Sequence, residues 1–176
     1  ENIAWFDIVD DNASKKRGRV RILDRRVYPM SITYVDCYHH KEVATAIKHM
    51  VTQSGGPLLA VTMGMVLAAY ETKGMTKEET LAYLKKAALS LGHARPTTAS
   101  RMLHLTEKAY RLAKSEPWED HKTLIALLQA NAISEATLRY QKFFKVATYL
   151  AKKVPPQGTV MTYCFAETVI GMLCLI

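Results

Sequence analysis

The sequence has few cysteines, and their arrangement excludes two common kinds of small protein. Only three occur, at wide spacing and without a Cys-x-x-Cys pair: Cys37, Cys164 and Cys174. An odd count at this spacing makes neither a disulfide framework nor a set of zinc ligands. We therefore expect a reducing compartment, and we predict neither a metal nor a cofactor.

Long apolar runs are also missing. No stretch of about 18 uncharged apolar residues occurs, so no membrane span is expected. Asp7, Asp10 and Asp11 interrupt the first apolar stretch, which argues against a signal peptide. Because hydrophobic residues make up 49% of the chain and charged residues 23%, intrinsic disorder is excluded. The composition predicts a globular cytoplasmic protein.

Negative charge is scarce between residues 15 and 26. The chain has a formal charge of +8, and residues 15–26 hold seven cations against one anion. Such a cluster is a candidate nucleic-acid site. However, residues 19–22 (Arg-Val-Arg-Ile) alternate as a half-buried strand does, and no aromatic residues lie between the cations. We favour a solvated hairpin and do not expect nucleic-acid binding.

Alternation and turn residues predict strands first and helices afterwards. The predicted strands cover residues 3–9, 19–23 and 32–38. From residue 41 the apolar period becomes helical. The apolar face of this first helix consists of Val43, Ala46, Ile47, Met50 and Val51.

Four further helices follow, separated by Gly or Pro. Residues 57–72 are apolar on nearly every side, so this helix should lie at the centre of the fold. Thr76 and Glu79 have the spacing of a capping box, and the helix that they begin runs to about residue 91. Pro96 opens the next helix, and a long helical region after Pro117 runs to residue 153.

The strongest break in the chain is Val-Pro-Pro-Gln-Gly at residues 154–158. We place a domain boundary there, with one domain over 1–154 and the start of a second over 155–176. Residues 159–163 are predicted as a strand, and an apolar helix follows from Thr168. Since a lone strand and an apolar helix cannot bury themselves, we expect the chain to be the front part of a longer protein.

The turn before the central helix reads Ser54-Gly55-Gly56-Pro57. Two glycines let the backbone approach an anion, and free N–H groups at a helix start favour phosphate. The same residues also make an ordinary turn between two helices, which the spacing alone favours. The segment matches neither a P-loop nor a dinucleotide fingerprint.

A second candidate is Arg95, which stands directly before Pro96 and Thr97 at a predicted helix start. An arginine in this place combines a bidentate phosphate donor with helix N–H groups and a threonine hydroxyl. The alternative is a helix start with an exposed arginine.

Cys164 is the candidate nucleophile or proton carrier. It follows the predicted strand 159–163 and precedes a helix, and a thiolate is stabilised at such a helix start. The alternative role, a small buried core residue, fits Cys37 and Cys174 well.

Three histidines, His39, His40 and His49, lie close together in the sequence. No carboxylate or second cysteine completes a metal-binding set with them at usable spacing. We predict that they are surface or capping residues.

Taken in order, these segments resemble the methylthioribose-1-phosphate isomerase family, which also includes ribose-1,5-bisphosphate isomerases and the alpha, beta and delta subunits of the translation-initiation nucleotide exchange factor. The resemblance implies an α+β fold. A small antiparallel sheet and a helical bundle would be followed by the first strand and helix of a Rossmann-like domain. The matching segments are residues 3–5, 22–24 with Pro29, 43–51, 54–57, 95–97 and 160–164.

The resemblance implies an aldose–ketose isomerase of a phosphorylated pentose, acting as a homodimer. Ser54, Gly55, Gly56 and Arg95 would bind the phosphate, and Cys164 would be catalytic. The isomerases carry Arg-Gly-Ala-Pro where this chain has Ser-Gly-Gly-Pro, so one phosphate-binding cation is missing. The alternative is therefore a non-catalytic regulatory subunit of the exchange-factor type that senses a phosphate ligand.

Overall fold

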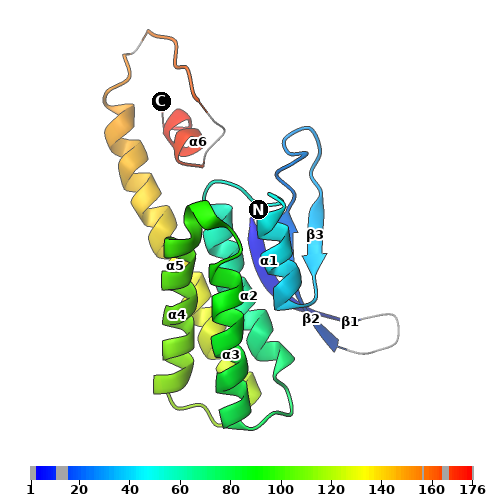
Figure 1. Cartoon of the computed structure of the whole chain (residues 1–176). Helices are drawn as coiled ribbons and strands as arrows, with labels where there is room; N and C mark the ends of the chain where they lie inside the picture. Colours follow the sequence, from blue (N-terminus) through cyan, green and yellow to red (C-terminus); the bar gives the residue numbers. More distant parts are fainter. Residues whose placement is uncertain (1–2, 11–15, 156, 164–166, 176) are drawn as a thin grey trace. The chain divides into compact units, whose positions relative to one another are not determined.

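The computed structural model describes residues 3–10, 16–155, 157–163 and 167–175. Two compact units, residues 1–132 and 133–176, divide the chain within α5 (Figure 1). In chain order the elements are β1 (Ala4–Asp10), β2 (Lys16–Leu23), β3 (Tyr34–Cys37), α1 (His40–Lys48), α2 (Gly56–Glu71), α3 (Lys77–Gly92), the 3-10 helix η1 (Pro96–Thr98), α4 (Ala99–Ser115), α5 (His121–Ala151) and α6 (Glu167–Leu173).

The three predicted strands form one antiparallel sheet with β2 in the middle. Its register pairs Phe6 with Val20 and Val20 with Cys37, so these three side chains share one face. All three are buried, and the ring of Phe6 lies 6.0 Å from that of Tyr70 on α2. The third strand begins at Tyr34, two residues later than predicted.

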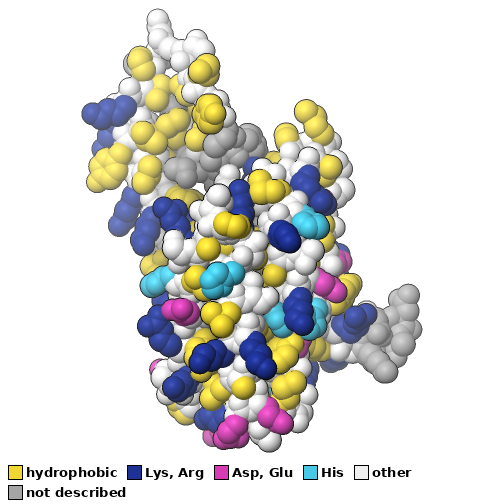
Figure 2. All heavy atoms as spheres, viewed as in Figure 1, with side chains coloured by type: hydrophobic (Ala, Val, Ile, Leu, Met, Phe, Trp, Pro, Cys, Tyr) yellow, Lys and Arg dark blue, Asp and Glu magenta, His cyan; other side chains and the backbone are white. Residues whose placement is uncertain are grey.

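The opposite face of the sheet carries arginines that are paired with carboxylates. Arg19 lies between Asp7 and Asp36, at 2.7 and 3.0 Å, and Arg21 donates two hydrogen bonds to Asp36. The predicted alternation of arginine with apolar residues is confirmed. Elsewhere on the face shown in Figure 2, Lys and Arg lie among acidic, histidine and apolar side chains rather than in one patch.

The helix α2 is the centre of the first unit, as the sequence predicts. Thirteen of its sixteen residues are buried, because β1, β2, α1, α3 and α4 all contact it. A helix without a polar side can be stable in water only when neighbours cover it all round. Its apolar sequence therefore dictates that the sheet and the other helices assemble around it (Figure 1).

The first helix is shorter than predicted. It ends at Lys48, and Met50 takes a left-handed conformation with φ of 61°. The N–H of Met50 donates to the carbonyl of Ile47, and that of Val51 donates to the carbonyl of Ala46. This is the Schellman pattern that ends many helices. The prediction that Met50 and Val51 belong to the helical face is therefore wrong, although Val51 is buried.

The start of α3 follows the predicted signal, and further hydrogen bonds fix the connection before α5. Thr76 and Glu79 form the capping box of α3, with both hydrogen bonds in place. Between α4 and α5, the indole N–H of Trp118 donates to the carbonyl of Ala113 at 2.8 Å. The carboxylate of Asp120 accepts from the N–H of Thr123 and so caps the first turn of α5.

The second unit contains the later part of α5 together with α6. The prediction of an apolar helix near Thr168 is confirmed, but residues 159–163 form no strand. A strand needs a partner for its backbone groups, and the structure describes no other strand in this unit. The division between the two compact units falls within α5 rather than at residues 154–158. The assignment of domains 1–154 and 155–176 stays a prediction.

The ion pairs of Asp36 predict how the stability of the sheet depends on pH. Hydrogen bonds from Arg21, with the positive charge of Arg19, hold the pKa of the Asp36 carboxyl below its ordinary value. Ionised Asp36 thus stabilises the fold above the unfolded-state pKa of about 3.9, and this contribution is lost as the pH falls through the lower folded-state pKa. Asp36→Asn should lower the free energy of unfolding by about 1–2 kcal/mol at pH 7.

Urea unfolding of the two proteins at pH 7 and near pH 2.5 measures this difference, which should shrink at the lower pH. Glu107→Gln is the control, because its exposed pair with Arg111 at 3.7 Å should contribute little. A difference for Asp36→Asn that does not change with pH would contradict the electrostatic origin.

Candidate functional site

The start of α2 exposes part of its backbone to a ligand. Ser54 is exposed and left-handed, with φ of 53°, a conformation that is uncommon for residues other than glycine. At this turn the N–H of Gly56 donates to Gln53 and that of Leu58 to Gly55, while Pro57 has none. Among the described residues, the N–H groups of Ser54 and Gly55 make no hydrogen bond; Ser54 is exposed and its N–H can receive an anion, whereas Gly55 is buried.

A glycine is required at position 56 by close packing. A Cβ there would overlap Oγ1 of Thr52 and would lie 3.1 Å from Cγ2 of Ile3. The Thr52 hydroxyl is fully buried and has no hydrogen-bond partner among the described residues. Thr52 and Gly56 are therefore a coupled pair.

Arg95 stands directly before η1 in an extended conformation, as expected for a residue that precedes proline. It is half-buried. The helix α3 runs antiparallel to α2, so the α3–α4 connection lies at the same end of the bundle as the α1–α2 connection (Figure 1). Arg95 belongs to the first of these connections and Ser54 to the second. The fold thus brings two candidate phosphate-binding segments, about 40 residues apart in sequence, to one end of the first unit.

The three cysteines have different surroundings. Cys164, the candidate catalytic residue, lies outside the described residues. Cys37 is buried as predicted, and this burial raises the pKa of its thiol to about 12, which makes it a poor nucleophile. The prediction that Cys174 is buried is wrong: its side chain is exposed, because it lies in the turn that follows the last residue of α6.

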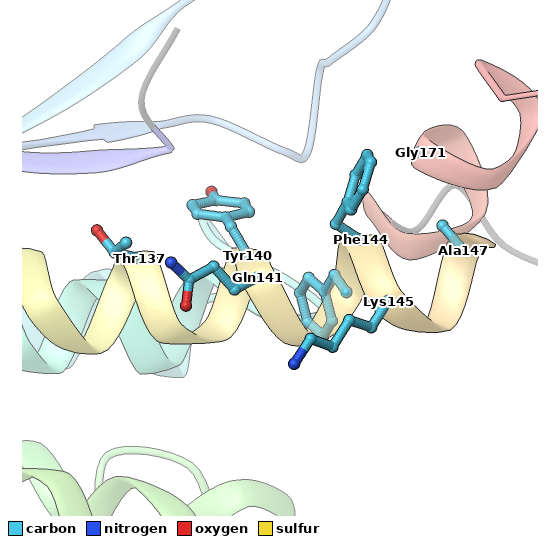
Figure 3. A pocket seen from close by; sticks show the side chains of 8 residues that line it. Thr137, Tyr140, Gln141, Phe144, Lys145, Ala147 and Gly171 are labelled. Atoms are coloured by element: carbon cyan, nitrogen blue, oxygen red, sulfur yellow. The ribbon is translucent and has the colours of Figure 1, made fainter. Parts of the chain in front are cut away.

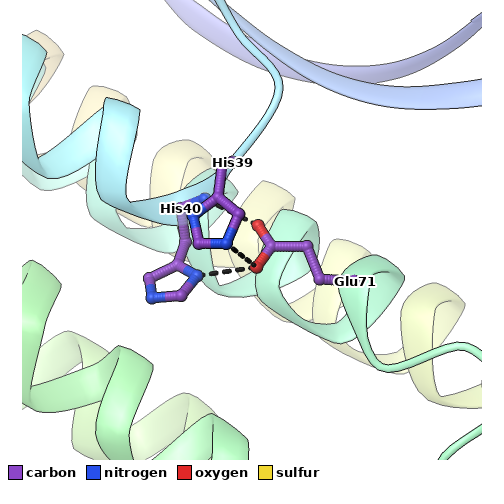
Figure 4. A group of neighbouring side chains, drawn as sticks. All are labelled: His39, His40 and Glu71. Carbon is purple, nitrogen blue, oxygen red and sulfur yellow. Dashed lines mark hydrogen bonds and ion pairs between the residues drawn. The ribbon is translucent and has the colours of Figure 1, made fainter.

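The structure brings together a group of side chains that the sequence analysis missed. His39 is a capping residue, as predicted, since its Nδ1 accepts from the N–H of Lys41. His40, in contrast, is 4% exposed and not a surface residue. Its Nδ1 lies 2.7 Å from Glu71, a carboxylate 31 positions later in the sequence (Figure 4). No local spacing could reveal this partner, because it belongs to a different helix.

An apolar cavity of about 680 Å³ lies in the second unit (Figure 3). Tyr140, Phe143, Phe144 and Ala147 on α5 line it, together with Gly171 on α6. Its walls are mainly aromatic and aliphatic carbon, and they do not supply the converging donors that a phosphate requires. We therefore place the candidate site at the start of α2 and not here.

No protein-family model matches the chain. Among characterised sequences, it is 30% identical over 153 residues to the methylthioribose-1-phosphate isomerase of Pelotomaculum thermopropionicum, covering 85% of this chain and 41% of that protein. A putative methylthioribose-1-phosphate isomerase of Pyrococcus horikoshii is 30% identical over 158 residues, covering 86% of this chain and 41% of that protein. The chain thus spans about two fifths of the length of these relatives.

The fold agrees with the sequence relatives. The crystal structure of 5-methylthioribose 1-phosphate isomerase from P. horikoshii superimposes with a TM-score of 0.75 at 23% identity, over 96% of this chain and 48% of that one. The delta subunit of translation initiation factor eIF-2B from A. fulgidus superimposes with a TM-score of 0.73 at 25% identity, over 94% and 46%. The chain belongs to the methylthioribose-1-phosphate isomerase and initiation-factor-2B-like family. The α+β fold predicted for this family, a small antiparallel sheet with a helical bundle, is confirmed.

The close contact between Thr52 and Gly56 gives a stability prediction. Gly56→Ala should destabilise the first unit by about 1–3 kcal/mol, because the added methyl group overlaps a buried hydroxyl. Combining it with Thr52→Ala should recover much of this loss, since the overlapping oxygen is then absent. Thermal unfolding of the wild type, both single variants and the double variant measures the coupling energy. Strictly additive effects would show that the overlap is relieved elsewhere.

Proposed function

We propose that the chain is part of an isomerase that interconverts the aldose and ketose forms of a phosphorylated pentose of the methylthioribose-1-phosphate type, in methionine salvage. The observation that carries the proposal is the position of the α2 start and Arg95 at one end of the bundle, in a chain whose relatives are named as this isomerase. A second copy of the protein, as a homodimer, stays a prediction.

In the proposed site the backbone and Arg95 share the phosphate. The N–H group of Ser54 would donate to one side of the phosphate, near the positive end of the α2 dipole. The guanidinium of Arg95 would donate to the other side as a planar, bidentate group. The buried Gly56 and Pro57 hold the turn in place beneath the ligand.

Cys164 is the proposed catalytic residue. A cysteine that carries a proton between neighbouring sugar carbons must work opposite a second acid–base group. The resemblance implies that this group is an aspartate, in a part of the related proteins that this chain does not cover. The isomerisation transfers one hydrogen from C2 to C1 of the sugar and one proton from the C2 hydroxyl to another sugar oxygen, with no net oxidation or reduction, so a pair of acid–base groups is sufficient.

A non-catalytic subunit that senses a phosphate ligand is the second candidate function. Ser54 stands where the isomerases carry arginine, and the fold also matches the delta subunit of eIF-2B. Such a subunit would use the same phosphate contacts but would show no turnover. Retention of Arg95 fits both functions, so activity of the full-length protein decides between them.

The phosphate contact predicts the effect of Arg95→Ala. Removing a charged hydrogen-bond donor should weaken binding of 5-methylthioribose 1-phosphate by about 1.5–3 kcal/mol, or roughly tenfold to hundredfold. Arg111→Ala is the matched control, because Arg111 is exposed and lies toward the other end of α4. Calorimetric titration of the full-length protein measures both affinities. Equal losses from the two substitutions would argue against the site.

A catalytic role predicts that Cys164→Ser abolishes turnover and leaves ligand binding nearly unchanged. Serine is close to cysteine in volume, but its hydroxyl is far less acidic than a thiol, whose ordinary pKa is about 8.5. The exposed Cys174 provides the control, and Cys174→Ser should retain activity. The measurement is the rate of isomerisation of 5-methylthioribose 1-phosphate. Full activity of Cys164→Ser would contradict the catalytic role of this cysteine. A wild-type protein that binds 5-methylthioribose 1-phosphate without converting it would favour the regulatory subunit.

A further inference from the structure

A second cluster of polar groups joins three helices of the first unit. His39 and His40 lie at the start of α1, Glu71 is the last residue of α2, and Tyr83 lies on α3. Figure 4 shows both imidazoles turned toward the carboxylate of Glu71. Since Gly56 and Glu71 are the two ends of α2, the cluster lies about 22 Å along the helix from the proposed phosphate site, and its role is independent of the proposed function.

One oxygen of the carboxylate lies within reach of all the other groups. Oε2 of Glu71 is 2.7 Å from Nδ1 of His40 and 3.3 Å from Nε2 of His39. The hydroxyl of Tyr83 donates to the same Oε2 and lies 3.3 Å from Nε2 of His39. The second oxygen of Glu71 accepts from the backbone N–H of His40 at 2.6 Å, which fixes the carboxylate.

These distances are close to those of a tetrahedral metal site. Four ligands that are each about 2.0–2.1 Å from a zinc ion lie roughly 3.3–3.4 Å from one another. The contacts of His39 with Glu71 and with Tyr83 already have this length, at 3.3 Å each. The two shorter hydrogen bonds, from His40 and Tyr83 to Glu71, would need to open by less than 1 Å. All three ligand atoms of His39, His40 and Glu71 lie within 4.8 Å of one another.

Burial and access also suit a metal ion. The side chains of His40 and Glu71 are 5% and 11% exposed, so the carboxylate is held in a mostly buried position beside imidazole nitrogen. The side chain of His39 is 41% exposed and gives a path from solvent to the cluster. Imidazole nitrogen with carboxylate oxygen is the donor set of Zn²⁺ and similar divalent transition metals.

We infer that His39, His40 and Glu71 form a binding site for a divalent transition metal such as Zn²⁺, with the hydroxyl of Tyr83 or a water as the fourth ligand. The proposed isomerisation does not require a metal, so we assign the bound metal ion a structural role. It would connect the ends of α1 and α2 to α3.

Metal binding has one consequence that distinguishes this site from casual binding to surface histidines. Without a metal, Nδ1 of His39 accepts from the N–H of Lys41, so the ring proton is on Nε2. When Nε2 binds a metal, the proton moves to Nδ1, and the N–H of Lys41 loses its acceptor. The metal therefore replaces the cap of α1, and the amide hydrogen of Lys41 should exchange faster with solvent in the metal-bound protein.

The experiment is titration of the full chain with Co²⁺ followed by Zn²⁺. We expect the intense visible absorption of tetrahedral Co²⁺, its loss when Zn²⁺ displaces the cobalt, and a higher melting temperature with Zn²⁺. His39→Asn is the sharpest variant, because asparagine also caps helices well and so preserves the cap while it removes the imidazole. It should weaken Zn²⁺ binding at least tenfold, and Glu71→Gln should do the same.

His49→Asn is the matched control, because His49 is an exposed histidine at the other end of α1. Its Zn²⁺ affinity should equal that of the wild type. Absence of the tetrahedral cobalt spectrum would overturn the proposal, as would equal affinities of the His39 and His49 variants. Zinc binding that leaves the exchange of the Lys41 amide unchanged would exclude His39 as a ligand.

Discussion

The burial of α2 is the constraint on which the first unit depends. This helix has no polar side, so it is stable in water only when the sheet and three other helices cover it. The apolar residues of β1 and β2 serve this purpose, and their polar faces are turned to the solvent side. The middle of α2 is buried among apolar side chains, so the candidate sites lie at its two ends. Ser54 and Gly55 directly precede the helix, and Glu71 is its last residue.

The partly buried charged groups Arg19, Arg21 and Glu71 of the first unit have hydrogen-bond partners. Arg19 and Arg21 lie on the sheet within hydrogen-bond distance of Asp7 and Asp36, which satisfies guanidinium groups that are partly withdrawn from water. Glu71 is more deeply buried and accepts hydrogen bonds from three groups on two other elements. The pKa of its carboxyl is below the ordinary value despite burial, because these hydrogen bonds favour the ionised form.

The turn before α2 depends on close packing beneath it. Gly56 leaves room for the hydroxyl of Thr52, and Ser54 is left-handed and exposed. Among the described residues, the backbone N–H groups of Ser54 and Gly55 make no hydrogen bond, although only Ser54 is exposed. In the proposed site Arg95 would carry a large share of phosphate binding, because it is the one cation of the two proposed binding segments.

The sequence by itself determined the order of the elements, the buried face of the sheet, the central helix and the capping box of α3, because each depends on local periodicity or on residues a few positions apart. Tertiary structure decided three other features. Met50 ends α1 in a left-handed turn without the usual glycine, since the burial of Val51 and two backbone hydrogen bonds stabilise it. Residues 159–163 have the composition of a strand, but the part of their unit that the structure describes contains no partner strand. His40 and Glu71 meet only because α1 and α2 pack together, and no local pattern encodes a contact between residues 31 positions apart.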